Sequence, residues 1–411
     1  MTTSQATAES PLYLQFSIAE RDRRWNAVRA LMSEAALDVI VVPNNTGHST
    51  DYQANARWLT HVGGGGDADV AAVIPLHGEV TAIPNRPAVS WHSGIQPWTR
   101  ELRNGGRDYG KATVERLKEL GVERGRIGIA GLVAGTRTPM GTILHGFYTQ
   151  LADAFPNAEL VDATRIFERV RYQKSPEEID VLTKSANIIE KGLEAKVAHA
   201  KAGAIDYEVW AEVMYALLKN GSELPVHTQW ASGKSVKHPL TRPTLRRLAR
   251  GDLIIAEVES SVMGYRAQAM QPVFVGVVDP VHVELMKLQR EIWNRVNDRL
   301  RPGVTVGELV ELTERLGAEL APKTGPAAGA IAQLNMHGRG QGDDGPLVTP
   351  AQRRPEQLAV PLLENMVFIF KPWLRTSDDA EHCAWGDTVV VTPSGGKRLG
   401  RRPHDNAVSE G

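Results

Sequence analysis

Residues 171–179 read Arg171-Tyr172-Gln173-Lys174-Ser175-Pro176-Glu177-Glu178-Ile179, and at this point the character of the sequence changes. Ser175 can cap a helix and Pro176 suits the first helical position. Glu178 lies three residues after the cap, where its carboxylate can bond back to the cap backbone. We therefore expect a long amphipathic helix from here to about Ala200, and a domain boundary just before it, near residue 168.

Toward the C-terminus, the sequence predicts further helices and strands. Asp206 can cap a second helix that ends before Gly221, and Thr305-Val306-Gly307-Glu308 is another capping box that opens a helix. Short apolar runs between these helices read as strands, namely residues 253–258, 273–278, 367–370 and 388–392. The segment 397–411 is rich in arginine and proline, and we expect it to be a loose tail.

Toward the N-terminus, strand-like and helix-like segments alternate. The strand-like runs cover residues 37–42, 70–74, 80–83 and 127–130, and helical patterns cover residues 18–34 and 111–120. This alternation is typical of an α/β domain. Gly63-Gly64-Gly65-Gly66 lacks the lysine and the Ser/Thr of a phosphate-binding loop, so we expect a flexible loop there.

Composition limits the classes of function. The chain has 411 residues, which predicts two domains, and its formal net charge of -1 gives no attraction to nucleic acid or acidic membranes. No apolar run approaches the ~20 residues that a membrane span needs, and the first ten residues lack the apolar core of a signal peptide. A single cysteine, Cys383, excludes an internal disulfide, so we expect a cytoplasmic protein.

Several segments in the second half resemble the family of creatinase, aminopeptidase P and prolidase. They are the helix entry at 171–179, the strand pair within 251–276, the turn Met336-His337-Gly338-Arg339-Gly340 and the strands in 365–372 and 386–392. The resemblance covers about residues 169–395. It implies an α+β chain: a smaller creatinase-type α/β domain at 1–168, followed by a catalytic-type domain of the pita-bread fold at 169–411.

The metal-dependent members of this family use two aspartates, one histidine and two glutamates as ligands. Carried over position by position, the aspartates become Glu257 and Gln268, and the glutamates become Lys371 and Gly386. Only the histidine, His337, is retained.

The altered positions change the charge of the site. They sum to zero, because Lys371 balances Glu257, and two divalent ions would leave about +4 in a partly dry site. We therefore expect no metal and no other cofactor, with Lys371 facing Glu257.

Creatinase itself works without a metal, but its own pattern is also broken. The family's upstream histidine matches His238, whereas its two catalytic glutamates fall on Met270 and Lys371. The resemblance therefore does not imply hydrolysis of creatine.

The remaining polar residues form the candidate site. His238, Glu257, His337 and Lys371 are the catalytic candidates, since histidine exchanges protons near neutral pH and lysine can bind an anion or act as a base. The substrate-binding candidates are Gln268 for an amide, Arg266 and Arg339 for a carboxylate, and Glu259, which shares a strand face with Glu257.

The residues leave other interpretations of this site open. Glu257 and Lys371 can form a purely structural ion pair. Asp344 falls where many family members carry a second histidine, and His382 offers a substitute metal ligand.

The leading hypothesis is a cytoplasmic, homodimeric, metal-independent hydrolase that cleaves a C–N bond, or uses related acid–base chemistry, in a small polar metabolite. One alternative is a metallopeptidase of the Xaa-Pro dipeptidase or aminopeptidase type with unusual ligands. Another is an inactive binding or scaffold protein, because loss of ligands is also how inactive homologues arise.

Overall fold

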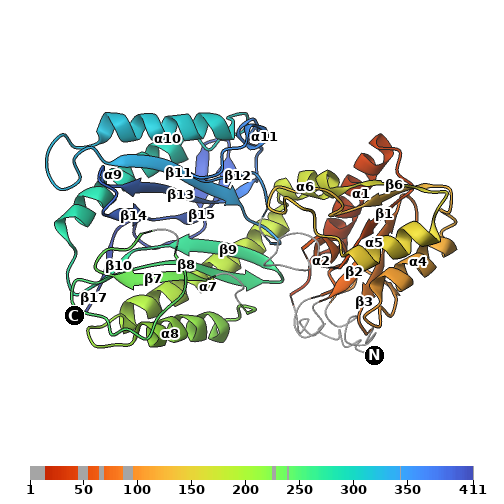
Figure 1. Cartoon of the computed structure of the whole chain (residues 1–411), viewed down its shortest axis with the longest axis horizontal. Coiled ribbons are helices and arrows are strands. Elements are labelled where there is room, and N and C mark those ends of the chain that lie inside the picture. Colours follow the sequence, from red (N-terminus) through yellow and green to blue (C-terminus); the bar gives the residue numbers. More distant parts are fainter. Residues whose placement is uncertain are drawn as a thin grey trace, which may run out of the picture. The chain divides into compact units, whose positions relative to one another are not determined.

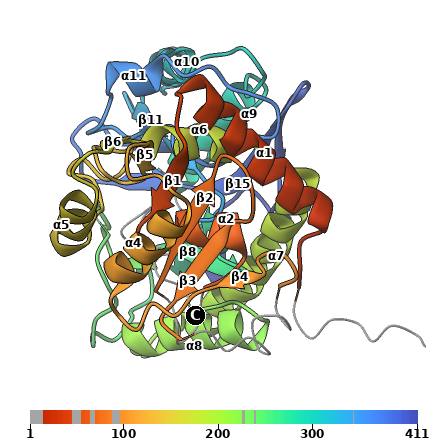
Figure 2. The same ribbon diagram turned by 90° about the vertical axis from the view of Figure 1, so that its right-hand side faces the viewer.

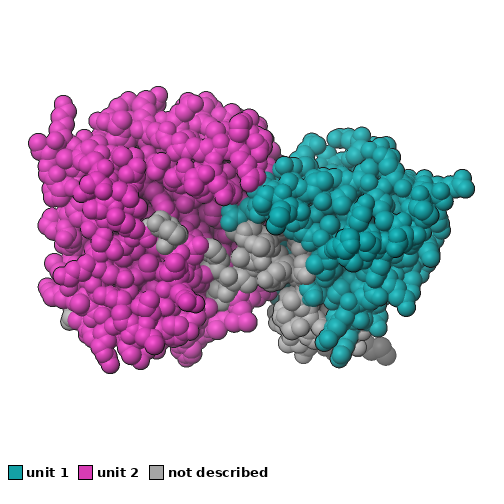
Figure 3. Space-filling view, in the orientation of Figure 1, with its two compact units in different colours: residues 1–170 teal, residues 171–411 magenta. Residues whose placement is uncertain are grey.

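The computed structural model describes residues 14–44, 54–63, 69–86, 96–224, 228–237, 240–342 and 344–410. The chain divides into two compact units, residues 1–170 and 171–411, which Figure 3 colours separately. Gly64, Gly65 and Gly66 of the expected flexible loop lie outside the described residues. Among the described residues, no helix combines the length and the apolar character that crossing a membrane requires.

The first unit is built on a six-stranded sheet in the order β4-β3-β2-β1-β5-β6. Its strands are β1 (Val39–Val42), β2 (Val70–Pro75), β3 (Thr81–Pro84), β4 (Glu101–Leu102), β5 (Arg126–Ile129) and β6 (Glu159–Asp162). Its helices are α1 (Ile18–Glu34), α2 (Ala54–Thr60), α4 (Tyr109–Glu119), α5 (His145–Ala154) and α6 (Thr164–Tyr172), which runs two residues past the unit boundary.

Helices cover both faces of this sheet. Figures 1 and 2 show α4 and α5 on one side of it and α1 on the other. All four residues of β1 are buried, as expected for a strand between two helical layers. The predicted α/β domain is therefore confirmed.

The second unit contains two sheets. The first has the order β17-β10-β8-β7, with β9 paired to β8, and the second has the order β12-β11-β13-β15-β16, with β14 paired to β13. The first consists of β7 (Gln229–Gly233), β8 (Leu253–Val262), β9 (Tyr265–Met270), β10 (Val273–Val275) and β17 (Ala407–Ser409). The second consists of β11 (Ile331–Gly338), β12 (Leu347–Val348), β13 (Val367–Arg375), β14 (His382–Ala384), β15 (Asp387–Thr392) and β16 (Gly395–Arg398).

Helices enclose these two sheets. They are α7 (Pro176–His199), α8 (Asp206–Lys219), α9 (Pro280–Asn297), α10 (Val306–Leu320) and the short α11 (Pro355–Leu358). Figure 1 shows the sheets between α7 and α8 on one side and α9 and α10 on the other. This is the pita-bread arrangement that the resemblance implied.

The predicted capping box opens α7. The Ser175 hydroxyl accepts from the backbone N–H of Glu178 at 3.1 Å, and a carboxylate oxygen of Glu178 accepts from the Ser175 N–H at 2.9 Å. The other carboxylate oxygen accepts from the Tyr265 hydroxyl at 2.6 Å, which ties the helix start to β9. Asp206, in contrast, does not cap α8. It is buried and accepts from the Trp230 indole N–H at 2.6 Å.

The prediction of a loose tail from residue 397 onward is wrong. β16 pairs with β15, and β17 adds a parallel strand to β10. Two of the three arginines in this segment lie over an aromatic ring, because the guanidinium carbons of Arg398 and Arg402 are 4.6 and 4.5 Å from the Trp385 ring centre. Arginine stacks on aromatic faces and packs there despite its charge.

His404 completes this aromatic contact. Its imidazole stacks on Trp385 with 3.8 Å between the ring centres. Burial, reinforced by the positive charges of Arg398, Arg290 and Arg402, lowers the pKa of His404 from 6.5 to about 3. The folded protein therefore holds this imidazole neutral at neutral pH.

The His404 imidazole makes folding stability depend on pH. Because its folded pKa lies below the unfolded value, the unfolded chain takes up the proton first, and stability falls as the pH drops below 6.5 toward 3. We expect His404→Phe to remove a loss of up to about 1.4 kcal/mol per pH unit between about pH 6.5 and 5. Urea unfolding across this range measures it, with the exposed His199→Gln as control. Parallel profiles for wild type and His404→Phe would contradict the assignment.

Candidate functional site

Six of the eight candidate residues lie on four strands of the second unit, β8, β9, β11 and β13, whereas Arg339 follows β11 and His238 lies outside the described residues. Glu257 and Glu259 are on β8, and in the antiparallel register of β8 and β9 Glu259 lies opposite Gln268. Lys371 on β13 lies opposite Asn335 on β11. Directly opposed residues, and residues two apart, project to the same face of a sheet. The register therefore places Glu257, Glu259 and Gln268 on one face of the first sheet, and Lys371 and Asn335 on one face of the second.

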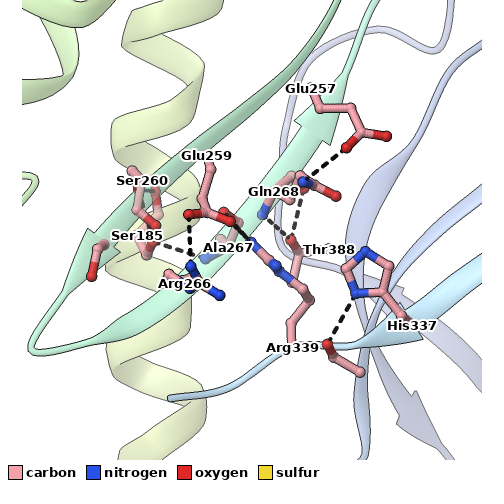
Figure 4. Close-up of polar contacts among 12 residues, drawn as sticks. Ser185, Glu257, Glu259, Ser260, Arg266, Ala267, Gln268, His337, Arg339 and Thr388 are labelled. Carbon is pink, nitrogen blue, oxygen red and sulfur yellow. Dashed lines mark hydrogen bonds and ion pairs between the residues drawn. The ribbon is translucent and has the colours of Figure 1, made fainter. Parts of the chain in front are cut away.

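Lys371 forms an ion pair with Glu257, as the sequence predicted. The two side chains are almost fully buried, with Lys371 2% and Glu257 5% exposed. Gln268 contacts both partners: its amide N–H donates to Glu257 Oε2 at 3.4 Å, and its Oε1 accepts from Lys371 Nζ at 3.4 Å. Figure 4 shows Gln268 beside Glu257 with this contact drawn. The three side chains form one connected polar group.

The backbone of Gln268 is fixed as firmly as its side chain. The Thr388 hydroxyl accepts from the Gln268 N–H at 2.9 Å and donates to the Gln268 carbonyl at 2.8 Å (Figure 4). This double contact joins β9 to β15 and holds Gln268 in place between the two charges.

The resemblance placed the family's last metal-binding glutamate at Gly386. Its backbone exchanges hydrogen bonds with Met270, at 3.0 and 3.1 Å. A Cβ atom at this position would lie 2.5 Å from Lys371 Cβ and 3.1 Å from the Phe370 carbonyl oxygen. Any side chain at position 386, a glutamate included, therefore requires Lys371 or the backbone to move.

The residues at the five aligned positions do not fit a divalent metal. Within the described ranges, no three histidine, cysteine, aspartate or glutamate residues are grouped so that they can hold a metal ion. The Lys371 ammonium contacts the one carboxylate, and an ammonium is not a ligand. A divalent ion about 4 Å from this ammonium would be repelled by about 8 kcal/mol at an effective dielectric constant of 20.

The residues considered as substitute ligands are engaged elsewhere. His382 Nε2 lies 3.1 Å from Asp379 Oδ1. Asp344 forms ion pairs with Lys174 at 2.7 Å and with Arg171 at 2.8 Å. Neither side chain is grouped with Glu257.

Arg266 and Arg339 hold a carboxylate of the chain itself. Both pair with Glu259, Arg266 at 3.3 Å, and Figure 4 shows the three side chains together. Glu259 and Arg339 are both 0% exposed. Binding of a substrate carboxylate by these arginines stays a prediction.

His337 lies on β11, opposite Ile369, with its side chain buried. Its Nδ1 is 3.2 Å from the carbonyl oxygen of Gly338 (Figure 4). Because it is two residues from Asn335, which opposes Lys371, it projects to the same face of the sheet as Lys371. His238, the other candidate histidine, lies outside the described residues.

Sequence reasoning missed two residues of the site, Asn335 and Thr388. Asn335 is buried opposite Lys371, and its side-chain oxygen has no hydrogen-bond partner in the described part of the chain. The period-two spacing from His337 could have identified Asn335. No local signal identifies Thr388, because its partner Gln268 is 120 residues away.

Removal of one charge from the Glu257–Lys371 pair leaves the other buried without its counter-charge. We expect Glu257→Gln and Lys371→Met each to lower the free energy of unfolding by about 3–5 kcal/mol. The double variant should lose clearly less than the sum of the two singles, and urea denaturation measures all four proteins. Glu291→Gln, at an ion pair whose side chains are about half exposed, is the control and should cost less than about 1 kcal/mol. Additive losses would show that the two charges do not interact.

Comparison with known families finds two matches along the chain. Residues 180–393 match metallopeptidase family M24, and residues 24–173 match the creatinase/prolidase N-terminal domain. Creatinase of Bacillus sp. strain B-0618 is 24% identical over 314 residues, which cover 73% of this chain and 71% of the relative. Xaa-Pro dipeptidase of Pyrococcus horikoshii is 25% identical over 256 residues, which cover 62% of this chain and 70% of the relative.

Solved structures resemble the chain over nearly its whole length. The X-Pro aminopeptidase of Thermotoga maritima has a TM-score of 0.76 at 18% identity, covering 93% of this chain and 99% of that one. The Xaa-Pro dipeptidase of Bacillus anthracis also has a TM-score of 0.76 at 18% identity, covering 94% and 99%. At this identity the likeness establishes the fold.

Proposed function

The chain belongs to metallopeptidase family M24, and from this premise we propose that it is a metal-independent hydrolase that acts on a small polar metabolite. The names of its relatives, creatinase and Xaa-Pro dipeptidase, both describe hydrolases and support an enzymatic role. The single cysteine supports a cytoplasmic location, since a reducing compartment needs no disulfide.

One observation supports the metal-independent reaction: the buried ion pair of Lys371 and Glu257 at positions where the family binds metal. The ammonium supplies positive charge at that place, and Glu257 and Gln268 hold it there. A preorganised positive charge in a water-poor site stabilises negative charge that develops on a substrate oxygen. Lys371 therefore replaces the electrostatic effect of a metal without providing a metal-bound water.

The proposed reaction divides the work among the buried side chains. The Lys371 ammonium contacts the oxygen of a substrate carbonyl, or a nitrogen of a substrate amidine, and so polarises the carbon bonded to that atom. Gln268 and Asn335 present amide groups that bind polar parts of the substrate. His337 moves a proton, from the attacking water to the leaving nitrogen, as imidazole does near neutral pH. A C–N bond breaks and a C–O bond forms.

The comparisons by themselves favour the metallopeptidase alternative. The matched family is described as metallopeptidases, and one relative is an Xaa-Pro dipeptidase. For this chain the alternative requires Lys371 to leave Glu257 and new ligands to replace Gln268 and Gly386. An inactive scaffold is the remaining alternative, and it requires no chemistry from the buried group.

Metal analysis combined with an activity screen separates these functions. We expect purified protein to contain far less than one metal per chain and to hydrolyse a member of a panel of small amides, ureas and Xaa-Pro dipeptides. EDTA should not change this activity, and Lys371→Met or His337→Ala should reduce it by about 10²-fold or more. The exposed Lys191→Met and His199→Ala are matched controls.

Each other outcome supports a different function. Stoichiometric manganese, iron, cobalt or zinc, with activity lost in EDTA, would establish the metallopeptidase. If no compound is hydrolysed and none raises the melting temperature, the scaffold interpretation is supported.

A further inference from the structure

Trp373 projects from the same face of the second sheet as Lys371. The two residues are two apart on β13, so their side chains lie side by side, with about 7 Å between the Cα atoms. Trp373 is opposite Gln333 on β11, as Lys371 is opposite Asn335. The sheet face that carries the ammonium therefore continues directly into an indole ring.

The first sheet meets this indole ring with apolar side chains. By the registers of β8 with β9 and β10, the residues on the same face as Glu257 include Leu253, Ile255, Met270 and Phe274. All four belong to one buried apolar cluster, and Trp373 packs against that cluster. The two sheets thus meet at two neighbouring levels, through an ion pair at Lys371 and through apolar contacts at Trp373.

Exposure rises along the strands from the level of Lys371 to the level of Trp373. Lys371 is 2% and Asn335 is 8% exposed, whereas Trp373 and Gln333 are both partly exposed. Ala231 on β7, which also packs against the apolar cluster, is partly exposed as well. A molecule that approaches Lys371 along this face of the sheet therefore meets the indole ring first.

A partly exposed indole ring beside a buried charge suits a ligand with two unlike parts. Sites for small molecules combine mostly apolar walls with a few polar groups that fix the orientation of the ligand. A flat ring of a ligand gains free energy from Trp373 beyond that of burying its apolar area, because aromatic rings favour stacked or edge contacts. The short distance along β13 limits the link between the polar part and the flat part to a few bonds.

We propose that Trp373 determines the substrate class of this site, which is amides or amidines with a flat apolar group one to three bonds from the reacting carbon. The oxygen or nitrogen on that carbon contacts Lys371, and the flat group lies against the indole ring. The proposal rests on the proposed function for the identity of the reacting group. The preference for a flat group comes from Trp373 and its apolar surroundings.

Binding of matched amides tests the preference without requiring turnover. We expect the wild type to bind benzamide about tenfold more tightly than acetamide, and about threefold more tightly than cyclohexanecarboxamide, whose ring is not flat. Saturation-transfer NMR measures the three dissociation constants. Trp373→Leu keeps an apolar side chain but should remove the preference over cyclohexanecarboxamide, whereas Trp373→Phe should retain it. Trp210→Leu, at another partly exposed tryptophan of the second unit, is the control and should change nothing.

The outcomes distinguish this inference from the proposed function. Where amides are hydrolysed, Trp373→Leu should lower kcat/KM for benzamide about tenfold and for acetamide less than about threefold. Equal losses for both amides would overturn the inference and leave the proposed function standing. Tight binding of benzamide that depends on Trp373, with no compound hydrolysed, would support the inference and contradict the proposed function. Equal binding of the three amides by the wild type, or no binding of benzamide, would overturn the inference even if Trp373→Leu fails to fold.

Discussion

The buried ion pair of Lys371 and Glu257 constrains how the strands around it can pair. Lys371 and Glu257 are almost fully buried, so each needs the other, and Gln268 supplies further polar contacts to both. Removal of two charges from water costs several kcal/mol per ion, and good geometry is needed to recover it. The strands that carry these side chains must therefore meet in one register, because a slip of one residue would turn each side chain to the opposite face.

Contacts of Gly386 and Arg402 help to maintain that register. Gly386 allows β15 to approach Lys371, and its backbone pairs with Met270 at the end of β9. Arg402 donates to the carbonyl oxygens of both residues of this bridge. Arg402 lies between β16 and β17, in the segment that was expected to be a loose tail, so that segment helps to position the candidate site.

The fold was predictable because its signals are local. The capping box at Ser175 and the apolar runs of β8, β13 and β15 need only neighbouring residues to be recognised, and each of them is present. The ion pair of Lys371 and Glu257 was predictable from charge balance at positions that the resemblance aligned. The engagement of Arg266 and Arg339 by Glu259 was not, because Arg339 and Glu259 are 80 residues apart and no local pattern joins them. The ordered C-terminal segment was missed for a similar reason, because Arg398 and Arg402 stack on the ring of Trp385.

The sequence separation within the central ion pair has a consequence for the newly made chain. Glu257 leaves the ribosome 114 residues before Lys371, which at roughly 5–20 residues per second is about 6–23 seconds. During that interval β8 carries a carboxylate whose neighbours are apolar and whose counter-charge does not yet exist. Because an uncompensated carboxylate is costly to bury, we expect β8 to stay in contact with water until β13 has been made.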